Sequence, residues 1–106
     1  MRRFTAKDLS RYLQDCDSPP LLLDVREPWE YEKCCLEGSE LVPMRQILMV
    51  ADELDPEKET VVICHHGIRS RQVAIYLEQQ GFNNVINLEG GVQAWAQDVD
   101  PTMNKY

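Results

Sequence analysis

The stretch Cys64-His65-His66-Gly67-Ile68-Arg69-Ser70 carries the residues in this chain that are best suited to chemistry. It directly follows the apolar run 61–63 and precedes a segment with helical spacing, so we predict a buried strand, a short loop and a helix in that order. A cysteine in such a loop directs its sulfur toward backbone N–H groups and toward the positive end of a helix. These conditions favour the thiolate and hold an anion beside it. We therefore expect Cys64 to be reactive, not merely a small buried apolar residue.

The residues that follow the cysteine could form an anion-binding loop. Gly67 permits a turn whose successive N–H groups point inward, although an ordinary turn glycine has the same appearance in a sequence. Arg69 could close the loop or bind an anionic group of a ligand, and a solvated arginine at a helix start is the alternative. We expect His65, His66 and Ile68 to contribute backbone N–H groups. The two imidazole rings should point in different directions and line the mouth of the loop.

A second group of polar residues ends the apolar run 21–25. Asp24 and Arg26 alternate there, so they could form an ion pair at the rim that supports the neighbouring loop. Solvated charges at the end of a strand are an equally open interpretation.

The cysteines show no metal-binding pattern. The chain has four of them, and none forms a C-x-x-C pair: Cys16, Cys34, Cys35 and Cys64. Cys34 and Cys35 are adjacent, which suits a tetrahedral zinc site poorly. A site built from Cys64, His65 and His66 with a remote cysteine is conceivable but not favoured. We interpret all four cysteines as free thiols and expect neither a metal nor an organic cofactor.

A set of short elements must position these residues. Apolar runs predict strands over residues 21–25, 41–43, 60–63 and 84–88. Helical spacing, turn residues and prolines predict helices over residues 5–15, 28–34, 44–54, 68–80 and from 92 onward. Strands that alternate with helices imply βαβ units, that is, an α/β fold with a parallel sheet and helices on both faces. Ligands bind such sheets beyond the carboxyl ends of the strands, where Cys64, Asp24 and Arg26 all lie.

Length and charge limit the classes of function. The chain has 106 residues, enough for one domain, which we assign to residues 1–97, with a frayed tail over 98–106. No apolar run approaches the roughly 18 residues of a membrane span, and no secretory signal follows Met1, so we expect a cytoplasmic protein. The net charge of −7 argues against nucleic acids and anionic membranes as partners.

Four sequence blocks, in order, resemble the single-domain rhodanese family of sulfurtransferases. They are Leu22-Leu23-Asp24-Val25-Arg26-Glu27 with Trp29-Glu30-Tyr31, Leu36-Glu37-Gly38-Ser39 with Val42-Pro43, the stretch 64–70, and Asn87-Leu88-Glu89-Gly90-Gly91-Val92-Gln93-Ala94-Trp95. The resemblance covers residues 3–95. It implies a single rhodanese-like α/β domain with a mainly parallel sheet of about five strands.

The resemblance also implies a function. Cys64 would accept a sulfane sulfur from thiosulfate or from a protein or small-molecule persulfide, and the loop 64–69 would hold the resulting persulfide. A thiol, cyanide or a sulfur-carrier protein would then accept the sulfur. The loop has His65 and His66 where efficient thiosulfate users have lysine or arginine, which puts thiosulfate in doubt as the donor. Cys34-Cys35 stand where many relatives have Gly-His.

Two alternatives remain at the level of the sequence. Related phosphatases and arsenate reductases share the fold, but their loop has seven residues and fits an oxyanion, whereas Cys64 to Arg69 is a loop of six residues. A non-catalytic protein-binding module is the other alternative, and the presence together of Cys64, Gly67 and Arg69 argues against it.

Overall fold

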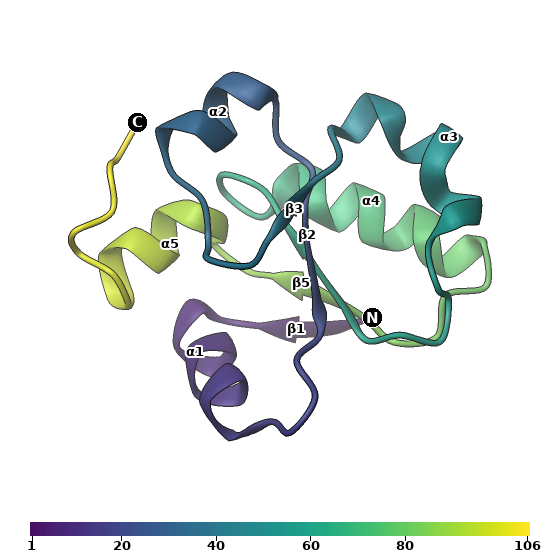
Figure 1. Ribbon diagram of the computed structural model, residues 1–106, viewed down its shortest axis with the longest axis horizontal. Coiled ribbons are helices and arrows are strands. Elements are labelled where there is room, and N and C mark those ends of the chain that lie inside the picture. The colour runs from purple at the N-terminus through teal and green to yellow at the C-terminus, as the bar shows by residue number, and fades with distance from the viewer.

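The apolar runs of the sequence form the centre of a five-stranded sheet. In the computed structural model, which describes residues 1–106, the strands lie in the order β1-β5-β4-β2-β3, and every pairing is parallel (Figure 1). Their bounds are β1 (Arg2–Phe4), β2 (Leu21–Asp24), β3 (Glu40–Leu41), β4 (Thr60–Ile63) and β5 (Val85–Leu88). All residues of β4 and β5 are buried, because helices cover both faces of the sheet.

The helices start where the sequence provides capping residues. Thr5 precedes the first helix and its hydroxyl accepts the N–H of Asp8 at 3.1 Å, while the Asp8 carboxylate accepts the N–H of Thr5 at 3.0 Å. Pro28 opens the second helix, where its fixed backbone angle suits the first turn. The bounds are α1 (Ala6–Asp15), α2 (Pro28–Lys33), α3 (Ile47–Val50), α4 (Ile68–Gln79) and α5 (Gly91–Asp98).

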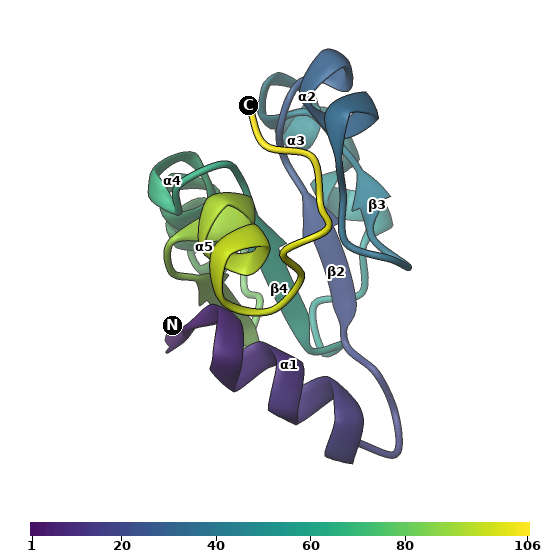
Figure 2. The ribbon, with the colours of Figure 1, turned by 90° about the vertical axis from the view of Figure 1, so that its left-hand side faces the viewer.

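Alternation along the strands divides the core into two clusters. Leu22 packs on one face of the sheet in the cluster that contains Leu9 of α1 and Val92 of α5. Its neighbour Leu23 packs on the other face in the cluster that contains Val73 of α4, since successive side chains of a strand point to opposite faces. Figures 1 and 2 show α1 and α5 on one side of the sheet and α3 and α4 on the other. The predicted α/β fold with a parallel sheet and helices on both faces is confirmed.

Two segments differ from the predictions. Strand β1 was not predicted, because its three residues carry no apolar alternation and are stabilised by pairing with the distant β5. The helix predicted over 44–54 is instead a 3₁₀ turn over Met44–Gln46, the short α3, and a second 3₁₀ turn over Ala51–Glu53. Leu48 and Met49 of this segment are exposed, so its apolar pattern is not that of a helix packed along its whole length. None of the helices is long and apolar enough to cross a membrane.

Candidate active site

Cys64 lies directly after β4, at the carboxyl edge of the sheet, and its side chain is turned inward. The residue is 1% exposed. Its Sγ accepts the backbone N–H of Gly67 at 3.1 Å and of Ser70 at 3.3 Å, and the Ser70 hydroxyl oxygen lies 3.4 Å away. The first turn of α4 thus supplies an N–H to the sulfur, as the strand–loop–helix pattern predicted.

The loop 64–69 is held in place by the start of α5. The N–H groups of Val92 and Gln93 donate to the carbonyls of Cys64 at 2.9 Å and of His65 at 3.0 Å. This approach is so close that a Cβ at position 91 would overlap both carbonyl oxygens, and only glycine fits there. With its carbonyls bound outward by α5, the loop is free to turn N–H groups toward the sulfur.

Gly67 is the turn point of the loop. Its φ of +95° lies in the left-handed region, and it is the residue from which α4 starts. A Cβ there would lie 3.0 Å from the backbone nitrogen of Gly90. Gly67 therefore meets both a conformational and a steric requirement, and another residue type would not fit this turn without strain.

Arg69 does not extend into the mouth of the loop as a free cation. Its Nη1 and Nη2 donate to the two carboxylate oxygens of Glu30 at 2.7 and 2.8 Å, in a bidentate ion pair. This hydrogen bonding, opposed by burial, lowers the pKa of Glu30 to about 2, and the same carboxylate raises the pKa of Arg69. The pair joins α2 to α4 across the site.

Asp24 and Arg26 form the ion pair that was one of their two interpretations. Nη2 and Nε of Arg26 donate to the Asp24 carboxylate at 2.7 and 2.9 Å, and both residues are fully buried. Arg26 also donates to the carbonyl of Cys34 at 2.6 Å and to the hydroxyl of Tyr106 at 2.8 Å. The pair thus connects the end of β2 to the end of α2 and to the C-terminal segment. The alternative interpretation, in which the two side chains are solvated at a strand end, is wrong because both are fully buried.

The two histidine rings stack on each other, contrary to the prediction that they point in different directions. Their centroids are 4.0 Å apart, and the ring of Tyr106 stacks on the other side of His65 at 4.1 Å. Burial, followed by the neighbouring His66, lowers the pKa of His65 below its ordinary value. His65 is thus a neutral aromatic surface at pH 7.

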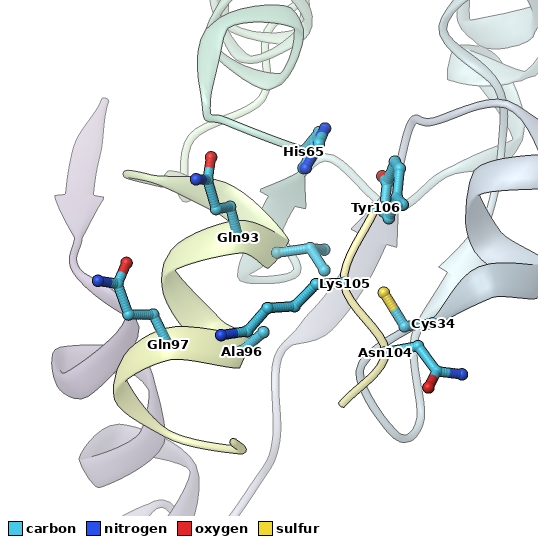
Figure 3. A pocket seen from close by; sticks show the side chains of 9 residues that line it. Cys34, His65, Gln93, Ala96, Gln97, Asn104, Lys105 and Tyr106 are labelled. Atoms are coloured by element: carbon cyan, nitrogen blue, oxygen red, sulfur yellow. The ribbon is translucent and has the colours of Figure 1, made fainter. Parts of the chain in front are cut away.

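A cavity of about 260 Å³ adjoins this stack. Figure 3 shows Gln93 from α5 on one side of it, Tyr106 from the C-terminal segment and the thiol of Cys34 on the other, and His65 from the loop at the top of the view. The segment after α5 runs back beside α2, as both ribbon views show (Figures 1 and 2). Tyr106 there bonds Arg26 and, at 3.0 Å, the carboxylate of Glu30.

Four residues of the site were not predicted. Glu30 and Tyr106 contact the site from other parts of the chain, and no local pattern marks them. Ser70 ends the predicted stretch 64–70, but the sequence alone assigns it no role. Asn87 had a detectable signal, since it is a lone polar residue within the apolar strand 85–88, and its amide reaches the Ser70 hydroxyl. No three His, Cys, Asp or Glu side chains gather as a metal site.

Comparison with known proteins identifies the family. The family model of the rhodanese-like domain matches residues 5–98. The chain is 45% identical over 89 residues to rhodanese-like/PpiC domain-containing protein 12, chloroplastic, of Arabidopsis thaliana, covering 80% of this chain but only 30% of that protein. It is 36% identical to a sulfurtransferase of Allochromatium vinosum, covering 87% and 85% of the two chains.

Solved structures agree with this result. The crystal structure of a rhodanese-like domain protein from Staphylococcus aureus superposes with a TM-score of 0.83 at 29% identity, over 90% of this chain and 91% of that one. The matched region contains every strand of the sheet but β1, together with the loop after β4 and the start of α5. The chain therefore belongs to the rhodanese-like domain family, among whose members are proteins named sulfurtransferases.

Proposed function

We propose that the protein is a sulfurtransferase that carries a sulfane sulfur as a persulfide on Cys64. The observation that carries this proposal is the environment of Sγ, which accepts two backbone N–H groups at the start of α4. Such donors stabilise a sulfur anion without a metal or a basic side chain. Family membership supports the same reaction class.

The reaction has two steps. In the first, the Cys64 thiolate attacks the outer sulfur of a donor such as thiosulfate; an S–S bond forms, the S–S bond of the donor breaks, and sulfite leaves with the electron pair. In the second, a nucleophile such as cyanide or a thiolate attacks the outer sulfur of Cys64–S–S⁻. The Cys64 thiolate then leaves and the enzyme returns to its starting state. His65, His66, Gly67, Ile68 and Arg69 complete the loop that surrounds the outer sulfur.

The size of the loop supports a sulfur substrate over an oxyanion. Six residues run from Cys64 to Arg69, and the Arg69 side chain is occupied by Glu30. A phosphate or arsenate group at the cysteine would need a free arginine fork to neutralise its charge. A single sulfur atom does not. The Arg69–Glu30 pair also leaves no cation of the loop free for thiosulfate, so we propose a persulfide as the physiological donor.

Intact mass spectrometry tests the proposal. The purified protein should gain the mass of one sulfur atom after exposure to a sulfane donor and lose it after cyanide, with thiocyanate formed. Cys64→Ser should show neither change, whereas Cys16→Ser, Cys34→Ser and Cys35→Ser should show both. Sulfur transfer by the Cys64→Ser protein would overturn the proposal. So would the absence of any persulfide in the wild type together with hydrolysis of a phosphoester or reduction of arsenate.

A further inference from the structure

A buried chain of polar groups leads from Cys64 through Ser70 of α4 to Asn87 of β5. The Ser70 hydroxyl oxygen lies 3.4 Å from Cys64 Sγ and 2.5 Å from Asn87 Oδ1. Ser70 and Asn87 are fully buried, so no solvent competes for these contacts. We infer that Asn87 is a positioning residue that controls the hydroxyl proton of Ser70 and, through it, the reactivity of Cys64. This inference rests on the proposed role of Cys64 as the nucleophile.

The orientation of the Asn87 amide is fixed by its other partners. Its Nδ2 donates to the carbonyl of Gly67 at 3.2 Å and to the carboxylate of Glu89. Both partners only accept hydrogen bonds, so the NH₂ group must face them and the carbonyl oxygen must face Ser70. An amide oxygen cannot donate. Ser70 therefore gives its single hydroxyl proton to Asn87.

This arrangement leaves only lone pairs of the Ser70 oxygen for Cys64. A thiol satisfies them, because its S–H can donate to Ser70. A thiolate does not, since its own lone pairs then face those of the hydroxyl oxygen. For Ser70 to donate to the thiolate, its proton must turn away from Asn87, which leaves a buried amide oxygen without a partner. Asn87 thus disfavours the bare thiolate.

The persulfide does not have this conflict. Once Sγ is bonded to a second sulfur, it has no proton and no formal charge, because the negative charge lies on the outer atom. Ser70 can then keep its proton on Asn87 while Sγ still faces the N–H groups of Gly67 and Ser70. Asn87 therefore favours the sulfur-loaded enzyme over the empty thiolate, and it raises the driving force for loading.

The other ionisable groups near Cys64 each have an identified partner or position. Arg69 of α4 is paired with Glu30 of α2, and Glu89 after β5 is bound by the Asn87 amide. His65, in the loop itself, has its pKa lowered, mainly by burial. His66, stacked on it, is exposed. Glu89→Gln is the matched control, because it removes the charge that touches Asn87 but leaves the hydroxyl–amide contact in place.

The test is the pH profile of Cys64 alkylation by iodoacetamide, quantified by peptide mapping. In Asn87→Leu, Ser70 is free to donate to the thiolate, so the midpoint of the profile should move to lower pH by about one unit, a tenfold gain in thiolate. In the Ser70→Ala background, Asn87→Leu should have no further effect, and Glu89→Gln should stay within a few tenths of a unit of wild type. An unmoved midpoint in Asn87→Leu, or an equal shift in both backgrounds, would overturn the inference.

A second measurement does not depend on folding of the Asn87 variant. The infrared S–H stretch of Cys64, isolated by difference from Cys64→Ser, should appear at the lowered frequency of a hydrogen-bonded thiol and should rise in Ser70→Ala. A wild-type band at the free-thiol frequency would contradict the inference. Neither readout requires sulfur transfer. If alkylation couples Asn87 to Ser70 and no persulfide forms, the proposed function fails and the contact between the two residues stands.

Discussion

At the residue scale, Glu30 is a nearly buried carboxylate that several hydrogen-bond donors surround. Its side chain is 5% exposed, and its carboxylate accepts hydrogen bonds from both terminal nitrogens of Arg69 and from the hydroxyl of Tyr106. These donors hold its pKa at about 2, well below the ordinary 4.5, although burial acts in the other direction. Folding thus favours the ionised form of Glu30, and the ionised carboxylate in turn stabilises the folded state.

This pKa gives the direction of the acid response. A carboxyl whose pKa is lowered on folding contributes stability that is complete above about pH 4.5 and is lost as pH falls toward 2. Glu30→Gln should lower the free energy of unfolding by about 2–3 kcal/mol at pH 7, and the difference from wild type should shrink below pH 4. Urea unfolding at several pH values measures this. Glu32→Gln, an exposed residue of the same helix, should behave as wild type, and parallel pH profiles for all three proteins would refute the pairing.

The sequence was sufficient for some residues of the site and not for others. Cys64 and Gly67 could be predicted because a strand, a loop and a helix in series determine where a sulfur and a left-handed glycine must lie. The partner of Arg69 could not be predicted, since Glu30 precedes it by 39 positions and meets it only in the folded chain. For Asp24 and Arg26 the sequence left an ion pair and solvated charges equally open, because their complete burial depends on α2 and on Tyr106, which cover them.

At the scale of elements, the contact between α5 and the loop 64–69 determines the shape of the site. The first N–H groups of α5 bind two carbonyls of the loop, and the backbone of Gly91 lies directly against them. The central strands and most helices followed from apolar periodicity, because burial on a parallel sheet imposes it. The contact between α5 and the loop did not follow from periodicity, since it depends on the tertiary approach of two segments. Its two hydrogen bonds join residues 28 positions apart, an interval comparable to a βαβ unit.

Gly91→Ala tests this contact. The added methyl group must displace α5 or the loop, so we expect the free energy of unfolding to fall by about 2–5 kcal/mol and sulfur transfer to be lost. Gly81→Ala is the matched control. Gly81 also has a left-handed φ, of +95°, but open space around its missing side chain, so its cost should be about 1–2 kcal/mol with activity retained. Equal losses in the two variants would mean that backbone conformation alone, and not the close approach, requires Gly91.

At the scale of the whole molecule, the segment 99–106 returns across the carboxyl edge of the sheet. Tyr106 stacks on His65 and bonds Arg26 and Glu30, so the last residue of the chain meets residues from the end of β2, from α2 and from the loop 64–69 at one site. No local pattern predicts this contact, because the segment has no apolar periodicity, and a frayed tail over 98–106 is the expectation from the sequence. Its docked position places an aromatic wall on the cavity beside the loop.

The His65 pKa reports whether the segment stays docked in solution. Burial is the main cause that lowers this pKa, and the ring of Tyr106 covers one face of the imidazole. In Tyr106→Ala the pKa of His65 should therefore rise toward its ordinary value of about 6.5, as measured by NMR titration of the imidazole protons. Tyr106→Phe keeps the stack and should leave the His65 pKa low. The same titration in the Ala variant and in wild type would show that the ring does not cover His65.

Because Trp29 contacts Tyr106, its fluorescence should depend on whether the C-terminal segment is docked. Trp29 is 57% exposed, and its indole meets the Tyr106 ring edge-on, with ring centroids 5.7 Å apart. The other tryptophan, Trp95 of α5, packs against the core cluster, and its carbonyl accepts the backbone N–H groups of Val99 and Asp100. Displacement of the Tyr106 ring would thus alter the surroundings of the Trp29 indole directly. The fluorescence emission of Trp29 should therefore report, without an added label, whether a donor or acceptor displaces Tyr106 from its docked position.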